Sequence, residues 1–329
     1  MLSCVIINFN GKELLSGCID SLLAMKNVEK EVVVLDNLST DGSVDFLRKH
    51  YPKIRIIQNK VNRGYAGGAN DAIRETSGEY VMLLNPDIRL NPDYAATLLM
   101  RMRYAKDVGA IAGKLLKYDF KNDRATKIID SAGLQMFKNR RCVDRGQGEH
   151  DIGQYEVAEE VFGVTGACPL YRREALEDVM VCGEYFDEDF FMYKEDVDIS
   201  WRMRLFGWAC FYDPQAIGFH GRGTGAVLRK NLVEVAKKRS DLSKFQRGLS
   251  YRNERLMRLK NEFLSMFFGN AHNILLKEFL FLGLMLSSER FLFKSFFEIL
   301  RYAPRAFKKR RIIQRRKIIS ARDLRRWFI

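Results

Sequence analysis

Several features that define common protein classes are scarce in this sequence of 329 residues. Its six cysteines include no C-x-x-C pair, which argues against a zinc ribbon or a disulfide framework and suits a reducing cytosol. The first strand-like segment is not followed by G-x-G-x-x-G, so we do not expect a nicotinamide-dependent enzyme. The most apolar run, residues 279–286, is shorter than the roughly 20 residues of a membrane span. The N-terminal segment MLSCVIINFNG lacks a basic region and a cleavage site, so it indicates a strand rather than a signal peptide.

Positive charge is concentrated at one end of the chain. From Arg229 onward there are 26 lysine and arginine residues against 8 aspartate and glutamate residues, a net charge of +18. The first 228 residues carry 29 and 33 of these residues, a net charge of −4. We therefore expect a mildly acidic globular domain over residues 1–227 and a basic helical region over residues 228–329. Such a basic region attracts polyanions, either anionic lipid or nucleic acid.

Strand-like and helix-like segments alternate through the first third of the sequence. Short apolar segments at residues 2–8, 31–35, 54–57 and 80–84 indicate strands, and the segments between them have helical spacing. The connections are short. This alternation predicts an α/β fold, with a mostly parallel sheet covered by helices on both faces. Residues 117–156 are polar and irregular, and there we expect an insertion or a β-hairpin flap.

The last third of the sequence has long, amphipathic helical patterns. Phenylalanines alternate with charges over residues 291–297, and KKRR at 308–311 is followed by RRK at 315–317. Phenylalanine and leucine on one face with lysine and arginine on the other favour helices that lie in a membrane interface. An ordinary helical subdomain packed on the first domain is the alternative.

Polar residues follow the predicted strands where a parallel sheet binds its ligands, at the carboxyl ends. Asn8 and Asn10 follow the first strand, Asp36 ends the second, and Asp87 follows the fourth after a proline. A glycine-rich run, residues 62–70, leads into a helix, where a backbone can approach a ligand closely. Capping or turn formation is the alternative role for each.

A second group of carboxylates stands at the start of a predicted helix. Glu195, Asp196 and Asp198 follow an apolar run, and the helical pattern behind them ends at Gly207. Negative charge at a helix N-terminus is favoured by the helix dipole, so capping is one role for these acids. Catalysis is the other.

Five motifs in this order resemble the inverting glycosyltransferases of family 2, which have the GT-A fold. They are VIINFNG at 5–11, LDNLSTDGS at 35–43, NRGYAGGAN at 62–70, LLNPDI at 83–88 and FMYKEDVDISWRMRLFGW at 191–208, with a later His220. The resemblance covers roughly residues 2–225. Within the family the chain looks most like the bacterial rhamnosyltransferase-type branch, which builds surface polysaccharides.

The resemblance implies a role for each matched residue. Asp196 would be the general base, Glu195 would position the acceptor or support that base, and Asp198 would keep a capping role. Asp87 and His220 would bind a divalent cation, Mg²⁺ or Mn²⁺, although Asn85-Pro86-Asp87 retains only the last acid of the family's D-x-D motif. For His220, packing in a loop is the alternative. The residues expected to bind the nucleotide sugar are Asn8, Asn10, Asp36, Asn62, Arg63, Gly64 and Asn85.

These roles together predict sugar transfer with inversion. One carboxylate removes the proton of the acceptor hydroxyl, and the departing nucleoside diphosphate needs its charge neutralised. The expected donor is dTDP-rhamnose or a UDP-hexose, and the expected acceptor is a glycan or lipid-linked glycan. The enzyme would be cytoplasmic and bind peripherally to an anionic membrane surface, with no nucleic acid as partner. The alternatives are a nucleotidyltransferase that makes a nucleotide sugar, and a non-catalytic protein that binds nucleic acid or membrane.

Overall fold

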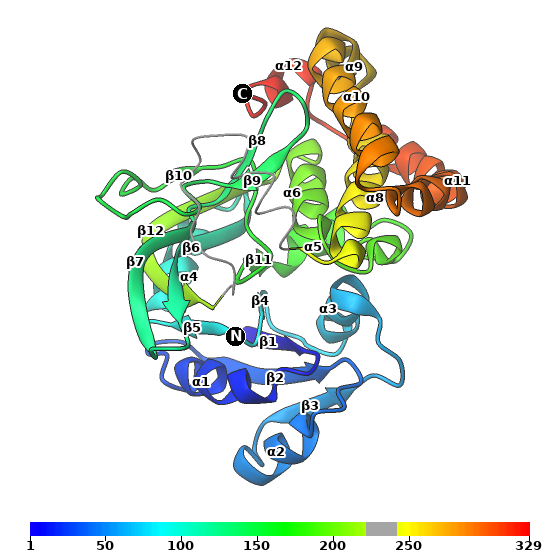
Figure 1. Ribbon diagram of the computed structural model, residues 1–329. Coiled ribbons are helices and arrows are strands. Elements are labelled where there is room, and N and C mark those ends of the chain that lie inside the picture. Colours follow the sequence, from blue (N-terminus) through cyan, green and yellow to red (C-terminus); the bar gives the residue numbers. More distant parts are fainter. Residues whose placement is uncertain (222–241) are drawn as a thin grey trace.

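A computed structural model describes residues 1–221 and 242–329, and Figure 1 shows its arrangement. The boundary expected at residue 227 and the loop at residues 222–225 therefore lie outside the described residues. The elements of the first half are β1 (Leu2–Asn8), α1 (Lys12–Leu23), β2 (Lys30–Asp36), α2 (Ser43–His50), β3 (Arg55–Gln58), α3 (Gly64–Arg74), β4 (Tyr80–Leu84), β5 (Ile88–Leu90), α4 (Tyr94–Tyr104), β6 (Val108–Asp119) and β7 (Arg124–Ser131).

The second half begins with short strands and ends in helices. Its elements are β8 (Leu134–Met136), β9 (Cys142–Asp144), β10 (Glu159–Glu160), β11 (Leu170–Arg172), α5 (Arg173–Val179), the 3-10 helix η1 (Glu188–Phe190), α6 (Glu195–Leu205), β12 (Ala209–His220), α8 (Lys244–Asn261), α9 (Leu264–Gly269), α10 (Ala271–Ser287), α11 (Leu292–Arg316) and α12 (Ala321–Arg325). The flap expected over residues 117–156 is present as two hairpins, because β7 pairs with the end of β6 and β8 pairs with β9.

One mixed sheet organises the molecule, with the strand order β10-β12-β6-β11-β4-β1-β2-β3. Strands β3, β2, β1 and β4 are parallel to one another, and β12 runs parallel to β6. The short β11 is antiparallel to both β4 and β6. The expected mostly parallel α/β sheet is thus confirmed.

Helices cover both faces of the sheet because residues of the central strands alternate between two cores. Val5 and Ile7 of β1 belong to a core that includes residues of α3, α5 and α6. Cys4 and Ile6 belong to a second core with residues of α1, α2 and α4. Every residue of β1 and β4 is buried, as expected for strands covered on both sides.

Helix α8 stands beside α5 and α6, and α11 lies on its far side (Figure 1). Helix α8 packs along α11 and touches α6, so this region contacts the sheet-bearing part of the chain. Near the end of the chain, Phe328 stacks edge-on against Phe162 and Trp201 in the first core. Among the described helices, none combines the length and the apolar content that crossing a bilayer requires.

Candidate functional site

The candidate site lies where β1, β2 and β4 end. The parallel register places Asn8 beside Asp36, and β4 ends at Leu84 just before Asn85. Asn8 donates through Nδ2 to Asp36 Oδ1 at 2.9 Å, and the backbone N–H of Ser39 donates to Asp36 Oδ2 at 2.9 Å. Asp36 is buried and both its oxygens accept a bond, so it holds the loops after β1 and β2 together.

The loop after β1 presents an aromatic side chain that our sequence reasoning missed. Asn10 adopts a left-handed backbone conformation with φ 53°, and its Oδ1 accepts the N–H of Thr40 at 2.8 Å. Phe9, between Asn8 and Asn10, is 51% exposed although it is a large apolar residue. An exposed ring at a strand end offers a face for stacking, and its position between two asparagines was the available signal.

The segment at residues 62–64 is held by protein contacts. The guanidinium of Arg63 lies 2.5 Å from Asp71 and 2.5 Å from Glu188, so it faces helix α3 and η1. Asn62 accepts the N–H of Gly64 at 2.8 Å. These contacts give Arg63 a role in joining elements, in addition to the nucleotide contact that we predicted.

Gly64 is needed for a close backbone approach. Its φ is +67°, and a Cβ added there would stand 2.2 Å from the carbonyl oxygen of Phe191. The N–H of Ala66 donates to that same oxygen at 3.1 Å. Gly64 thus lets the start of α3 pack against the segment that precedes Glu195 and Asp196.

Asp87 and His220 meet at the same edge of the sheet. Strand β12 ends at His220, opposite Ile88, so the histidine belongs to a strand and not to a loop. Its Nε2 lies 3.3 Å from Asp87 Oδ1, and its Nδ1 lies 2.8 Å from Asp130 Oδ2. Burial alone would lower the pKa of His220, but the hydrogen bonds to Asp130 and Asp87 outweigh it and raise the pKa to about 9.

This arrangement fits a cation that takes only part of its ligands from protein. Asp130 fixes the ring of His220 so that Nε2 points to Asp87, as carboxylates commonly do behind a metal-binding histidine. Within residues 1–221 and 242–329, no group of three histidine, cysteine or acidic side chains has metal-holding geometry. Asp87 and His220 would therefore share a cation with phosphate oxygens and water. Asp130 was not predicted, because it lies 90 residues from His220 in a polar segment.

Glu195 and Asp196 open helix α6. Asp196 accepts the N–H of Gly166 on Oδ2 at 3.1 Å and that of Val197 on Oδ1 at 2.8 Å. Burial and the neighbouring Asp144 raise the pKa of Asp196. Glu195 is 8% exposed, and its Oε2 has no hydrogen-bond partner among the described residues. Burial and the neighbouring Asp196 raise the pKa of Glu195 to about 8.

The two groups of acids contact one short segment. The N–H of Gly166 reaches Asp196, and the carbonyl of the next residue, Ala167, accepts the N–H of Asn85 at 3.0 Å. The hydroxyl of Tyr65 in α3 donates to the Gly166 carbonyl at 2.8 Å. Residues 166 and 167 therefore link the turn before Asp87 with the carboxylate of Asp196.

Asp198 does not cap the helix, so the capping part of the capping or helix-dipole role that we expected is wrong. Its side chain is fully buried. Oδ2 accepts from Arg202 at 3.1 Å, and Oδ1 lies 3.0 Å from Lys260 Nζ in α8. The carboxylate joins α6 to the C-terminal helices, and no local sequence pattern indicates a partner 62 residues away.

Comparisons with known proteins agree on one family. Residues 3–180, more than half of the chain, match the model of "Glycosyl transferase family 2". A poly-beta-1,6-N-acetyl-D-glucosamine synthase of Staphylococcus epidermidis is 27% identical over 222 residues, which are 66% of this chain and 48% of that protein. The enzyme of the same name from Staphylococcus aureus strain COL is 26% identical over 221 residues, with the same coverage of both chains. The chain thus spans about half the length of these relatives.

Solved structures show the same fold. TarS 1-349 of S. aureus, solved in complex with UDP, matches with a TM-score of 0.55 and 16% identity over 99% of this chain and 88% of that one. The mannosyltransferase PcManGT of Pyrobaculum calidifontis, solved with GDP-Man and Mn²⁺, matches with a TM-score of 0.53 and 16% identity over 92% and 75%. At this identity the similarity establishes the GT-A-like α/β fold and nothing further.

Proposed function

This chain belongs to glycosyl transferase family 2, and on that premise we propose that it transfers a sugar, with inversion, from a nucleoside diphosphate to a hydroxyl of a glycan or lipid-linked glycan. The observation that carries the proposal is the shared contact at residues 166 and 167. It brings the Asp87–His220 pair and the Glu195–Asp196 pair to one edge of the sheet. Transfer needs both groups, one beside the diphosphate and one beside the acceptor.

Asp196 is the proposed general base. Its Oδ2 is held by Gly166, and its raised pKa makes its carboxylate a stronger base than that of an ordinary aspartate. It would take the proton of the acceptor hydroxyl as that oxygen attacks the sugar carbon. Glu195 keeps its proton up to about pH 8, so at neutral pH it can donate a hydrogen bond to the acceptor without adding a second negative charge beside Asp196.

Asp87 and His220 are the proposed protein ligands of Mg²⁺ or Mn²⁺. When bound, the cation would neutralise charge on the diphosphate that leaves. Asp130 holds the imidazole in place for that role. Asn85 sets the turn through its backbone bond to Ala167, which delivers Asp87 to the strand end.

The nucleoside would bind at the loops after β1 and β2. Asn8, Asn10 and Asp36 shape these loops through the bonds described above, and Phe9 offers its exposed ring for stacking on the base. The relatives make UDP-N-acetylglucosamine the first donor to test, because their name specifies poly-N-acetylglucosamine. The dTDP-rhamnose donor and the rhamnosyltransferase-type branch remain predictions.

The C-terminal helices are proposed to rest on an anionic membrane at the cytoplasmic face. Helix α11 exposes an apolar stripe in which three residues are spaced seven apart, at 293, 300 and 307, and exposed basic residues stand directly beside it in the sequence. The stripe consists of Phe293, Phe296, Phe297, Leu300 and Phe307, and the basic residues are Lys294, Arg301, Arg305 and Lys308. Helix α10 adds the exposed Leu275, Leu276, Phe279, Leu280, Leu282 and Leu286. This pattern is typical of a helix that lies in a lipid headgroup region. We retain the division into domains 1–227 and 228–329 as part of this proposal.

The catalytic part of the proposal is tested by product analysis. The full chain is incubated with Mn²⁺ and a panel of UDP-, dTDP- and GDP-sugars, and released nucleoside diphosphate and pyrophosphate are measured separately. Release of nucleoside diphosphate is expected. Release of pyrophosphate would instead identify a nucleotidyltransferase.

The membrane part is tested by flotation with vesicles of anionic or zwitterionic lipid. The wild type should float with anionic vesicles, and Phe297→Ser with Leu300→Ser should weaken flotation. Met100→Ser with Tyr104→Ser removes two exposed apolar side chains of α4, outside the C-terminal helices, and is the matched control that should float as the wild type does. Equal flotation of the Phe297/Leu300 variant and the wild type would contradict the proposed surface.

A further inference from the structure

The segment that leads into the acid pair has an unusual backbone. Phe191, Tyr193 and Lys194 all have positive φ, at 64°, 70° and 73°, although none is glycine. L-residues rarely adopt this conformation, and it persists only where the surroundings hold it. Helix α6 begins at the next residue, so this turn determines where Glu195 and Asp196 stand.

A single buried amide holds the turn from the C-terminal side of the chain. Asn253 lies in α8 and is fully buried. Its Nδ2 lies 2.9 Å from the carbonyl oxygen of Phe190, 2.9 Å from that of Met192 and 2.8 Å from that of Tyr193. Three carbonyl groups of one tight turn therefore converge on one side-chain donor.

The neighbouring side chain orients that amide and extends the contact. Arg252 donates through Nε to Asn253 Oδ1 at 3.0 Å, which directs the Nδ2 group toward the turn. Its Nη2 donates to the carbonyl of Asp189 at 2.8 Å, and its Nη1 lies 3.1 Å from Glu298 in α11. The Arg252–Asn253 pair thus links two C-terminal helices to the backbone before α6.

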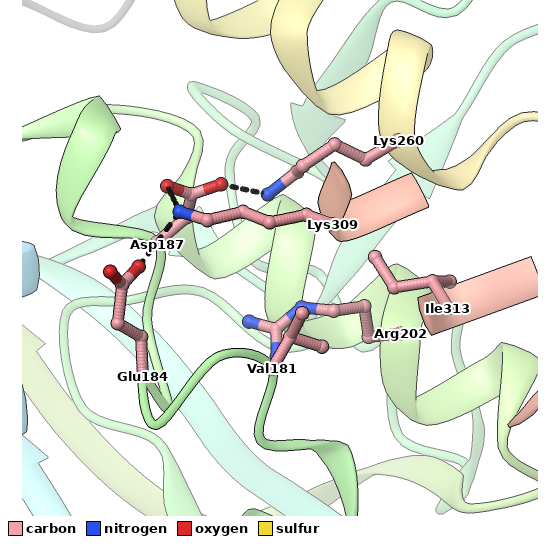
Figure 2. A pocket seen from close by; sticks show the side chains of 7 residues that line it. All are labelled: Val181, Glu184, Asp187, Arg202, Lys260, Lys309 and Ile313. Carbon is pink, nitrogen blue, oxygen red and sulfur yellow. Dashed lines mark hydrogen bonds and ion pairs between the residues drawn. The ribbon is translucent and has the colours of Figure 1, made fainter. Parts of the chain in front are cut away.

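Buried ion pairs hold the same segment on its other side. Figure 2 shows Lys260 of α8 and Lys309 of α11 converging on the carboxylate of Asp187. Lys309 also reaches Glu184 at 2.8 Å. The segment from residue 184 to the start of α6 is therefore clamped by two helices that come later in the chain.

We propose that Asn253 is a positioning residue, which holds the turn at residues 190–194 so that Asp196 faces the acceptor hydroxyl. The inference rests on the proposed transferase function for its catalytic consequence, although the structural role of Asn253 stands without it. The contacts described for Asn8, Asp36 and Asp87 all come from residues before 222. Loss of Asn253 should therefore impair turnover and spare nucleotide binding.

Two variants test this proposal, with a control on the same helix. Asn253→Leu keeps the approximate size of the side chain and removes the donor. Gln246→Ala is milder, because Gln246 is only partly buried. The change removes the bond from Gln246 Nε2 to the Tyr193 hydroxyl at 2.7 Å, together with the bond from the Ser243 N–H to Gln246 Oε1 at 2.8 Å, which caps the start of α8. The control is Arg258→Met, which breaks an ion pair with Glu278 in α10 and leaves the turn untouched.

Three quantities are measured on each full-length variant. They are hydrogen–deuterium exchange over residues 188–198, affinity for UDP with Mn²⁺, and the rate of UDP release from UDP-N-acetylglucosamine. For Asn253→Leu we expect faster exchange confined to that segment and a rate lower by about 10²-fold, the effect of a misplacement of about 1 Å. UDP affinity should fall far less than the rate, because Asn8, Asp36 and Asp87 make none of their described contacts with the turn, and only the segment at Arg63 and Gly64 borders it. Gln246→Ala should show the same pattern with a smaller loss, and Arg258→Met should resemble the wild type.

These measurements distinguish a failure of the role of Asn253 from a failure of the proposed function. Unchanged exchange in both turn variants, or equal loss of rate in Arg258→Met, would overturn the role of Asn253. A parallel loss of UDP affinity and rate would also overturn it, because that result indicates general unfolding. If the wild type releases no nucleoside diphosphate from any UDP-, dTDP- or GDP-sugar of the panel, the proposed function fails, and the exchange measurement still decides whether Asn253 holds the turn.

Discussion

Replacing Asp196 with asparagine separates catalysis from folding at the candidate site. Asparagine has the shape of aspartate but cannot take the proton of an acceptor hydroxyl. Turnover should therefore fall by about 10²–10⁴-fold, the usual contribution of a general base. Burial and Asp144 raise the pKa of Asp196. On acidification, the turnover of the wild type should therefore fall at a higher pH than it would with a base that has the pKa of an ordinary aspartate.

The structural cost of this change is small. Asp196 accepts one backbone N–H on each oxygen, at 3.1 and 2.8 Å, and asparagine retains one of these acceptors. Losing one such bond on a largely buried side chain costs about 1 kcal/mol of the free energy of unfolding. The variant should therefore stay folded and bind UDP with Mn²⁺ as the wild type does.

Asp198→Asn is the matched comparison, two residues further along the same helix. Asp198 is fully buried and compensates Lys260 and Arg202, so its loss should cost about 3 kcal/mol of stability, as removal of one partner of a buried ion pair does. The assay measures UDP release, UDP affinity and the urea midpoint for both variants. Wild-type turnover in Asp196→Asn, with the protein folded, would refute the assignment of the base.

Three further predictions follow from the charged groups. Asp130→Asn should reduce the affinity for UDP in Mn²⁺ by about 10–100-fold and leave the affinity without Mn²⁺ unchanged, as the loss of a group behind a metal ligand does. The same outcome for Asp87→Ala would support Asp87 and His220 as the cation site. Wild-type affinity of either variant in Mn²⁺ would exclude them. Lys309→Met removes the positive charge that faces two buried carboxylates, Asp187 and Asp189, and the partly buried Glu184. It should lower the free energy of unfolding in urea by about 3–5 kcal/mol, whereas Lys308→Met at the exposed neighbour should not; equal midpoints would refute this. The folded chain keeps the Glu195 proton up to about pH 8, whereas an ordinary glutamate loses it near pH 4.5, so the free energy of unfolding should fall as pH rises across that interval. Glu195→Gln should remove this pH dependence of the urea midpoint. The same pH dependence in the variant and the wild type would contradict the prediction.

The sequence predicted the parts of this structure that depend on local pattern. Alternating apolar segments predicted the sheet, because strands buried on both faces need continuous apolar residues such as those of β1 and β4. Asp87 and His220 were assigned to one site from the family resemblance, and the structure brings them to 3.3 Å. Parallel strands deliver their carboxyl ends to one edge, which is why residues distant in sequence meet there.

The sequence did not predict contacts that depend on how separate segments dock. Asn253 lies in a polar helical pattern, and nothing local shows that it binds three carbonyl groups of a turn some 60 residues earlier. Asp198 had the signature of a capping residue, because a carboxylate in a first helical turn is common whatever its long-range partner. The basic C-terminal third suggested attraction to polyanions, yet several of its basic residues, such as Lys260, form ion pairs with buried carboxylates.

The charged junction between the last helices and the 184–198 segment makes these helices difficult to transplant. Helices grafted from a relative would leave Asp187 and Asp198 buried without Lys260 and Lys309, unless the graft carried basic residues at the matching places. In homologous sequences these acidic and basic positions should therefore vary together, and the substitution of one without the other should be rare. Basic residues that look like an appended tail should thus be conserved together with the buried acidic residues that they pair with.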